Sequence, residues 1–223
     1  MPATLNRFVD RVDAGKRLAH ALQSYLGRKD VTVIGLPRGG VPVANEVARS
    51  LHLPLDVLVV RKLSTPGQEE LAMGAIASGG VIVNNPEVQR WFEHPDVLIK
   101  ESLARATVEL ERREALYRAI RMPLPLTGQT VIVVDDGAAT GATMQAAVRA
   151  LKNMKVARIV VALPVASRES CVAFEKEADQ VVSLLTPDSF GSVGEWYESF
   201  DQTTDEQVES LLRAAQPKNS RRA

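Results

Sequence analysis

Short apolar runs recur along the chain, with polar or glycine-rich turns between them. Runs of this length, rich in Val, Ile and Leu, are typical of strands that are buried on both faces. The predicted strands are VTVIG (31–35), LDVLVV (55–60), GVIVNN (80–85), TVIVVD (130–135), ARIVVALP (157–164) and QVVSLL (180–185). Each of them is bounded by residues that favour turns, so we expect separate strands.

Apolar residues at helical spacing occupy the segments between these strands. The predicted helices cover 18–26, 41–51, 96–121, a region from about 142, and 169–178. The charged stretch 96–121 is expected to be one long helix with Leu103, Leu110 and Ile120 on its inner face. Strands that alternate with helices predict an α/β fold with a doubly wound parallel sheet flanked by helices.

Two segments depart from this alternation. Residues 61–80 contain one proline and several glycines among mixed polar residues, which predicts a mobile excursion with some short strand. The last residues, 216–223, are predicted to be a disordered tail. The length suits a single domain over 1–215, with its core over about 28–186.

The composition is that of an ordinary soluble globular protein, with 45% hydrophobic and 24% charged residues. Lys+Arg and Asp+Glu both total 27, which argues against bulk electrostatic binding to nucleic acid or a membrane. The single Cys171 cannot form an internal disulfide. No signal-peptide region or membrane-length apolar run is present in the sequence, so we expect a cytoplasmic protein.

Three loops follow predicted strands on the edge of the sheet where ligands of such folds bind: 36–40, the residues from Arg61 onward, and 135–143. The stretch GAATGAT (137–143) has small side chains, so backbone N–H groups can approach a ligand closely. Thr140 and Thr143 add hydroxyl donors where a helix begins. These features predict a phosphate site; a tight turn with threonine caps is the alternative.

Two adjacent carboxylates, Asp135 and Asp136, precede this loop. Because phosphate would repel them, they are expected to bind something about one sugar length away. Paired carboxylates can accept hydrogen bonds from a vicinal diol, so a 5-phosphorylated ribose fits both features. An aspartyl-phosphate or metal site, as in receiver or phosphatase domains, and a solvated acidic turn remain alternatives.

The stretch VIVVDDGAATGAT (131–143) closely resembles the phosphoribosyl-diphosphate (PRPP) signature of type I phosphoribosyltransferases. The resemblance extends over about 31–185, and bacterial family members of undefined acceptor are similar along the whole chain. It implies that Asp135 and Asp136 bind the ribose hydroxyls and that the following loop binds the 5-phosphate. It further implies a small hood formed by the N- and C-terminal segments (187–215 at the C-terminal end) and a flexible loop over about 63–80.

The loop GLPRGG (35–40) resembles the family's diphosphate loop, in which we expect a cis peptide bond at Pro37–Arg38. Arg61 and Lys62 resemble further cationic contacts to the diphosphate. Arg38, Arg61, Lys62 and Asp136 are therefore the candidate catalytic residues. The implied PRPP-binding residues are Pro37, Arg38, Gly39, Gly40, Arg61, Lys62, Asp135, Asp136, Gly137, Ala138, Ala139, Thr140, Gly141, Ala142 and Thr143.

The acceptor is less defined. Hypoxanthine-guanine enzymes carry an Asp where this chain has Ala139, and they use a Lys where it has PVAS (164–167), so we do not expect that activity. Phe190, Trp196 and Tyr197 could stack on a base, while Asp188 and Glu195 could transfer protons. Packing within the hood is an equal alternative for the aromatic residues.

The resemblance implies transfer of 5-phosphoribosyl from PRPP to a small nitrogenous acceptor, with a nucleobase as the expected class, and release of pyrophosphate. Mg²⁺ is the implied cofactor, held mainly by PRPP, with contacts through water to Asp135 or Asp136 and no direct protein ligand. A PRPP-binding regulator without transferase activity is the alternative. A homo-oligomer, most simply a dimer, is expected, with no nucleic-acid or membrane partner.

Overall fold

The computed structural model describes residues 7–65 and 68–215 of the 223-residue chain. Its centre is a parallel sheet of five strands in the order β2-β1-β6-β7-β8, which confirms the predicted α/β fold. The strands are β1 (Val31–Gly35), β2 (Leu55–Val57), β6 (Thr130–Val134), β7 (Arg158–Val165) and β8 (Gln180–Leu185). Every residue of β1 and β6 is buried, because helices cover both faces of the sheet.

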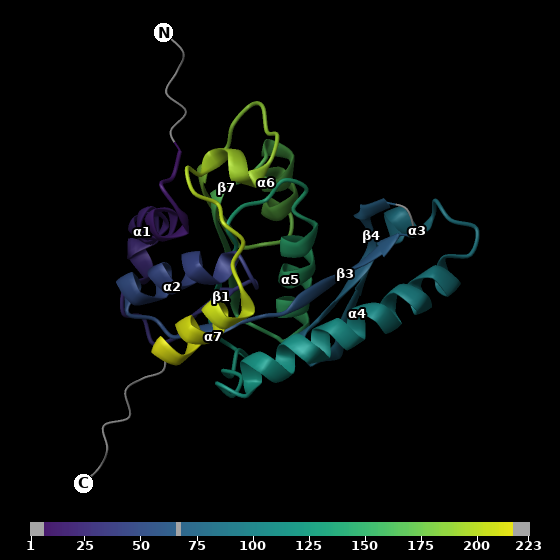
Figure 1. The fold of residues 1–223 in the computed structure, drawn as a ribbon, viewed down its shortest axis with the longest axis horizontal. Helices are drawn as coiled ribbons and strands as arrows, with labels where there is room; N and C mark the ends of the chain where they lie inside the picture. Colours follow the sequence, from purple (N-terminus) through teal and green to yellow (C-terminus); the bar gives the residue numbers. More distant parts are fainter. Residues whose placement is uncertain (1–6, 66–67, 216–223) are drawn as a thin grey trace.

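Helices α1 (Arg11–Ala21) and α2 (Gly40–Leu51) pack on one face of this sheet. Helices α5 (Ala142–Asn153) and α6 (Arg168–Glu175) pack on the other (Figure 1). The first helix begins well before the predicted 18–26, because Asp10 caps it by accepting a hydrogen bond of 2.8 Å from the Asp13 N–H. A 3₁₀ turn, η1 (Gln23–Tyr25), takes the place of the predicted end.

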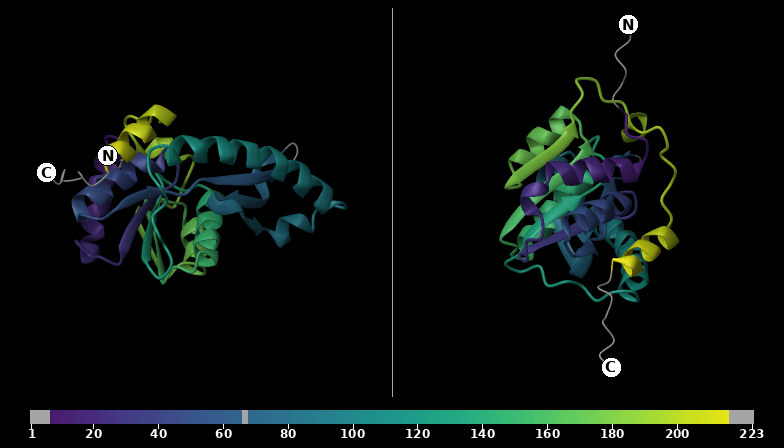
Figure 2. Two further views of the ribbon diagram at one scale, coloured as in Figure 1. Left: turned by 90° about the horizontal axis from the view of Figure 1, so that it is seen from below. Right: turned by 90° about the vertical axis from the view of Figure 1, so that its left-hand side faces the viewer.

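A second sheet projects from the core together with the longest helix (Figures 1 and 2). Strands β3 (Val60–Thr65), β4 (Gln68–Ala77) and β5 (Val81–Asn84) form an antiparallel sheet in the order β3-β4-β5. Helix α4 (Pro95–Arg118) packs along it through a cluster that includes Leu63, Ile76 and Leu110. We call these elements, with η2 (Ser78–Gly80) and α3 (Pro86–Gln89), the arm.

The arm corrects two sequence predictions. The flexible loop expected over 63–80 is mostly paired strand, since β3 and β4 pair from Val60↔Ala77 onward, with bulges near Leu63 and Ser64. The bulges and glycines hide the alternation that would have indicated these strands. The run 55–60 is also not one strand, because β2 ends at Val57 in the first sheet and β3 begins at Val60 in the second.

The chain after β8 forms the hood. Residues 186–204, which we call the strap, connect β8 to α7 (Asp205–Ala214) and include the 3₁₀ turn η3 (Val193–Trp196). The strap runs along the front of the core and meets the N-terminal segment, where the Phe8 N–H donates to the Trp196 carbonyl at 2.8 Å (Figures 1 and 2). The predicted tail, 216–223, lies outside the described residues. Within the described ranges, none of the helices is long and apolar enough to span a membrane.

Candidate functional site

Two loops meet at the carboxyl ends of the adjacent strands β1 and β6. An added Cβ at Gly40 would lie 2.7 Å from the Asp135 Cα, and one at Gly39 would overlap the Asp136 carboxylate. Both positions therefore require glycine for the loops to touch. The predicted cis peptide bond at Pro37–Arg38 is confirmed in the first of these loops. Sequence reasoning thus brought the two loops together correctly.

The two carboxylates of the acid pair each use one oxygen within the protein. Asp135 Oδ1 accepts the Asp136 N–H at 2.9 Å. Asp136 Oδ2 accepts a hydrogen bond of 2.9 Å from Arg11 Nε and forms an ion pair with Arg11 Nη2 at 2.8 Å. Among the described residues, Asp135 Oδ2 and Asp136 Oδ1 have no hydrogen-bond donor, so two acceptor oxygens are left on neighbouring residues for a ligand.

Burial gives this pair unusual electrostatics. Burial raises the pKa of Asp135 well above its ordinary value of 3.8, and the neighbouring Asp136 charge raises it further. Burial also raises the pKa of Asp136, while the positive charge of Arg11 opposes that rise. The pair is costly to keep ionised in the free protein, and ligand hydroxyl donors would relieve that cost.

The loop after the acid pair is held through one of its backbone carbonyls, while two of its residues are exposed to solvent. The Ala139 carbonyl accepts hydrogen bonds from the hydroxyls of Ser167 (2.7 Å) and Ser170 (2.9 Å) at the start of α6. Gly141 precedes α5 at φ 69°, and it offers that helix no side-chain cap. Ala139 and Thr140 are exposed. Thr140 is therefore accessible from solvent next to the start of α5, and an anion site at this helix N-terminus stays a prediction.

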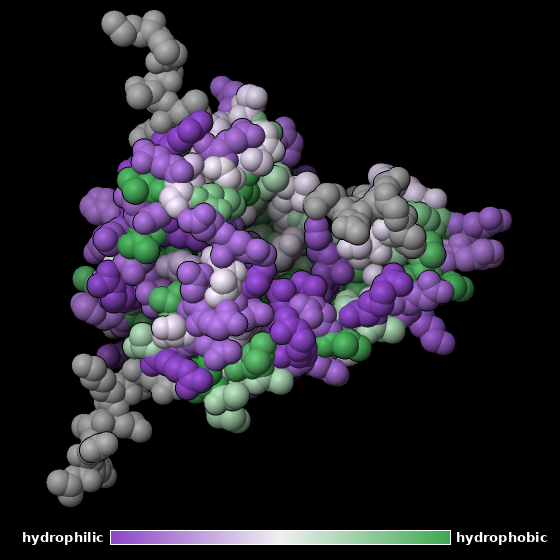
Figure 3. All heavy atoms as spheres, viewed as in Figure 1, coloured by the Kyte–Doolittle hydropathy of each residue, from purple (hydrophilic) through white to green (hydrophobic). Residues whose placement is uncertain are grey.

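A cluster of guanidinium groups lies where the arm meets the core. Figure 3 shows a hollow between the core and the arm. On α4, Glu109 accepts from Arg113 Nε at 2.9 Å and from Arg112 Nε at 2.9 Å, and its Oε1 lies 3.7 Å from Arg61 Nη2 on β3. Burial lowers the pKa of Arg61, and the charges of Arg113, Arg112 and Arg38 lower it further. This is a concentration of positive charge that reaches the 36–40 loop.

The arginine–lysine pair on β3 is divided between the two faces of the arm. Arg61 and Leu63 lie on the face that packs on α4. Because side chains alternate along a strand, Lys62 lies on the opposite face. The predicted contributions of Arg61 and Lys62 to one diphosphate site therefore come from two sides of the arm.

The aromatic residues expected at an acceptor site are largely packed inside the hood. Trp196 and Tyr197 are buried with Phe8 and Val165, and Phe190 packs against this cluster. The Tyr197 hydroxyl donates a 2.6 Å hydrogen bond to the Asp136 carbonyl, and burial raises the pKa of this hydroxyl. This arrangement favours the packing alternative for Trp196 and Tyr197, and it ties the hood to the acid pair.

The proposed proton-transfer residues lie at the outside of the strap. The Asp188 side chain is 93% exposed and pairs with Arg168 at 2.7 Å. Glu195 is exposed and accepts a hydrogen bond of 3.2 Å from the Ser192 hydroxyl. Neither contact places these carboxylates beside the acid pair.

Sequence reasoning missed Arg11. Its guanidinium is the direct partner of Asp136, although the two residues are 125 positions apart in the sequence. An arginine in the first turn of an amphipathic helix carries no local signal for such a role. Only the packing of α1 beside the 36–40 loop brings the two together.

Among the described residues, no group of three or more His, Cys, Asp or Glu side chains is arranged to hold a metal ion. Asp135 and Asp136 do offer hard carboxylate oxygens of the kind that Mg²⁺ prefers. Mg²⁺ commonly binds one or two carboxylates and completes its shell with water and substrate phosphates. The donor set therefore fits a Mg²⁺ ion that arrives with a phosphorylated substrate.

Comparisons with known proteins show the family of the chain. The model of the phosphoribosyl transferase domain family matches residues 5–199. "Putative phosphoribosyl transferase Rv0571c" of Mycobacterium tuberculosis H37Rv is 47% identical over 209 residues, as is its counterpart in strain CDC 1551. The match covers 93% of this chain but 47% of those proteins, so the chain spans about half the length of the curated relatives it matches.

A solved structure is similar over nearly its whole length. The crystal structure of TT1426 from Thermus thermophilus has a TM-score of 0.83 and 42% sequence identity to this chain. The match covers 93% of this chain and 98% of that one. With the family model matching most of the sequence, the chain belongs to the phosphoribosyl transferase domain family.

Proposed function

We propose that this protein is a PRPP-dependent phosphoribosyltransferase, which transfers 5-phosphoribosyl to a nitrogenous acceptor and releases pyrophosphate. One observation carries the proposal. Asp135 and Asp136 each leave one oxygen without a donor in the described structure, directly before a loop that opens a helix N-terminus. Two acceptors beside an anion site match a ribose diol and its 5-phosphate.

The binding roles follow from the two loops. The 5-phosphate lies on 137–143, where backbone N–H groups and the hydroxyls of Thr140 and Thr143 donate to it. The 2′- and 3′-hydroxyls donate to Asp135 and Asp136. The diphosphate lies against the 36–40 loop, next to Arg38 and the guanidinium cluster that contains Arg61.

In the reaction, the bond from C1 to the diphosphate oxygen breaks and a bond from C1 to the acceptor nitrogen forms. Negative charge accumulates on the departing diphosphate, so preorganised cations and loop N–H groups stabilise the transition state more than the ground state. Arg38 and Arg61 supply this charge on the protein side. Mg²⁺, when bound with PRPP, would neutralise part of the same charge, and Asp135 or Asp136 would help to hold it through water.

The expected acceptor class is a nucleobase, and an oxopurine is disfavoured. Ala139 provides no carboxylate for proton transfer, and its carbonyl is held by two serine hydroxyls. Phe190, at the edge of the hood cluster, remains the most accessible aromatic candidate for stacking. A PRPP-binding regulator is the alternative, and it could use the same cations. Transfer is better supported, because the matching family model and the 47% identical relatives carry the name phosphoribosyl transferase. A cytoplasmic location and a homodimer remain predictions.

The test is pyrophosphate release. The protein is incubated with PRPP, Mg²⁺ and a panel of nucleobases and small amines, and pyrophosphate is measured for each. We expect release with one acceptor or a few related ones, and loss of release in Asp136→Asn. Asp30→Asn is the matched control, since Asp30 is exposed and directly precedes β1, at the end of that strand away from the site. PRPP binding without release on any acceptor would point to the regulator, and absence of PRPP binding would overturn both.

A further inference from the structure

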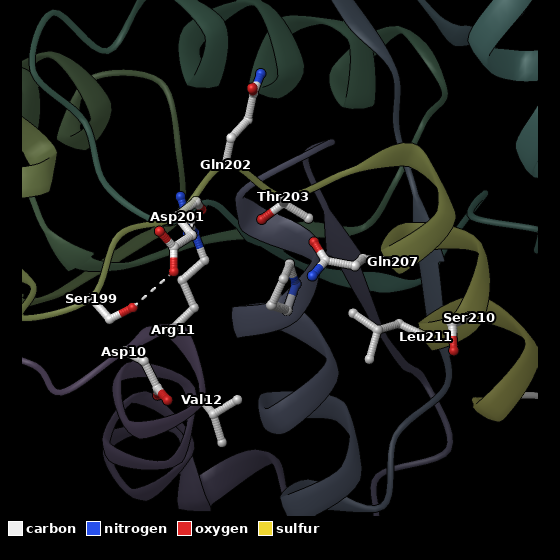
Figure 4. Close-up of a pocket in the computed structure, with 11 residues that line it drawn as sticks. Asp10, Arg11, Val12, Ser199, Asp201, Gln202, Thr203, Gln207, Ser210 and Leu211 are labelled. Carbon is white, nitrogen blue, oxygen red and sulfur yellow. Dashed lines mark hydrogen bonds between the residues drawn. The ribbon is translucent and has the colours of Figure 1, made fainter.

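Arg11 makes three polar contacts from the first residue of α1, and its side chain is only 12% exposed. Nε and Nη2 bind Asp136 Oδ2, and Nη1 donates to the Asp201 carbonyl at 2.7 Å. Figure 4 shows its guanidinium extending from α1 toward Asp201 of the strap. One cation therefore links the acid pair to the hood.

The strap returns to the acid pair by a second route. The Arg11 guanidinium lies 3.9 Å from the centre of the Phe200 ring. That ring packs on Tyr197 at 4.9 Å, and the Tyr197 hydroxyl binds the Asp136 carbonyl. Asp136 is therefore held at two points. Arg11 binds its side chain and Tyr197 binds its backbone carbonyl, and the Phe200 ring contacts both Arg11 and Tyr197.

An open pocket borders the strap beside Arg11. It has a volume of about 370 Å³ and lies between α1, α2, α7 and strap residues 199–203 (Figure 4). Val12, Pro42 and Leu211 form its apolar part. The strap is held here by the Arg11 bond to the Asp201 carbonyl and by the Ser199 N–H bond to the Val9 carbonyl at 3.0 Å.

The contact of Arg11 with Asp136 also determines which carboxylate oxygen of Asp136 is available to a ligand. Both donors of Arg11 bind Oδ2, so the other oxygen, Oδ1, is the one offered. A planar guanidinium fixes the orientation of a carboxylate in a way that the single ammonium of lysine does not. Arg11 also borders the diphosphate loop, because its Nη2 would lie 3.3 Å from a Cβ at Gly39.

We propose that Arg11 is a positioning residue for PRPP: it holds Asp136 with Oδ1 facing the ribose and fastens the strap over the ribose site. This inference rests on the proposed function, because it concerns the same acid pair. It adds a residue outside both substrate loops. It also predicts that ribose binding and strap position are coupled, so that a change at one is measurable at the other.

The test compares Arg11→Gln and Arg11→Lys with wild type by calorimetric titration of PRPP with Mg²⁺. Arg17→Gln is the matched control, since Arg17 lies on the same helix and forms its ion pair with Asp13 at the surface. We expect Arg11→Gln to weaken PRPP binding about tenfold to a hundredfold, as when the residue that orients a ligating group is lost. Arg11→Lys should recover only part of that affinity, and Arg17→Gln should bind as wild type does.

A double variant separates positioning from a general loss of structure. Asp136→Asn removes the carboxylate that Arg11 holds. Because Arg11 is proposed to act through that carboxylate, adding Arg11→Gln to Asp136→Asn should weaken PRPP binding little beyond Asp136→Asn alone. A purely structural role of Arg11 would make the two losses additive.

The coupling between ribose binding and the strap has a fluorescence readout of its own. The chain has two tryptophans, and Trp91→Phe leaves Trp196 in the strap as the only one. PRPP should change the emission of Trp196, and Arg11→Lys should reduce that change. Wild-type PRPP affinity with no Trp196 response, an Arg11→Gln variant with unchanged affinity, or additive losses in the double variant would overturn this inference alone. A wild-type protein that does not bind PRPP overturns the proposed function with it.

Discussion

Glu109 on α4 and Arg61 on β3 form a loose ion pair, with 3.7 Å between Oε1 and Nη2. The same carboxylate also binds Arg112 and Arg113 at 2.9 Å each. The Glu109 carboxylate therefore holds three guanidinium groups near the 36–40 loop, which is the proposed diphosphate site. A diphosphate that binds there competes with Glu109 for Arg61, the most loosely held of the three.

Glu109→Gln should therefore strengthen binding of inorganic pyrophosphate, roughly threefold, as expected for release of a partly exposed ion pair. The measurement is calorimetric titration of pyrophosphate in low salt, where such pairs are least screened. Glu101→Gln, at an exposed position of the same helix, is the control. Weaker pyrophosphate binding in Glu109→Gln would mean that Glu109 orients Arg61 rather than competing for it.

The same residue gives an acid-stability prediction. Hydrogen bonding to Arg112 lowers the pKa of Glu109 from 4.5 to about 2. A carboxylate with a depressed folded-state pKa stabilises the protein above its unfolded pKa, and this contribution is lost as the pH falls toward the folded value. Glu109→Gln should be less stable than wild type at pH 7, and the two melting temperatures should converge between about pH 4.5 and pH 2. A constant difference over that range would contradict the assignment.

Asp135 should have the opposite effect on stability. Burial raises its pKa, so the ionised form is unfavourable in the folded protein above that pKa and the neutral form is favoured below it. Asp135→Asn keeps an oxygen for the Asp136 N–H and removes the charge. We expect the ligand-free variant to melt at a higher temperature than wild type at pH 7, with a free energy of unfolding that is larger by about 1 kcal/mol or more. We also expect it to bind PRPP more weakly.

The stability gain of Asp135→Asn should disappear as the pH is lowered, because wild-type Asp135 then takes up a proton and becomes neutral as well. Asp136→Asn provides the contrast, since it leaves the Arg11 guanidinium without its carboxylate and should not stabilise the protein. A lower melting temperature for Asp135→Asn at pH 7 would show that the carboxylate has a favourable partner in the free protein.

Much of the site could be predicted because it is local in the sequence. Asp135, Asp136 and the loop to Thr143 are contiguous, and the strand before them and the helix after them follow from simple periodicity. Arg11 could not be found in this way, because its partner is 125 residues distant and is reached only through the packing of α1. Helix α4 and strand β5 of the arm were predicted, but the pairing of β3 with β4 was not, because register shifts near Leu63 and Ser64 break the alternation that identifies a strand.

Gly40→Ala should disable the site without removing any charged side chain. Its Cβ would lie 2.7 Å from both the Asp135 Cα and the Val134 carbonyl oxygen, which are backbone atoms that cannot rotate away. The two loops must then separate, and PRPP affinity should fall about a hundredfold, as for a displacement of about 1 Å. Gly27→Ala is the control, since φ there is +66° and nothing lies near its Cβ, so it should cost stability but not affinity. Equal affinity losses in both variants would mean that contact between the loops is not required.

Ser170→Ala tests the proposed phosphate loop, 137–143, separately from the proposed diphosphate loop, 36–40. The Ser170 hydroxyl donates to the Ala139 carbonyl at 2.9 Å and is buried, so its loss removes one of the two bonds that hold that carbonyl. Ser167 keeps both its own bond to Ala139 and its capping role for α6. Ribose 5-phosphate should bind a few-fold more weakly, about 1 kcal/mol for one hydrogen bond, while pyrophosphate binding stays unchanged. Ser183→Ala removes a comparable bond, to the Leu185 carbonyl at 2.8 Å on β8, and should alter neither ligand. If Ser170→Ala weakens both ligands equally, the 137–143 loop and the 36–40 loop form one anion site rather than two.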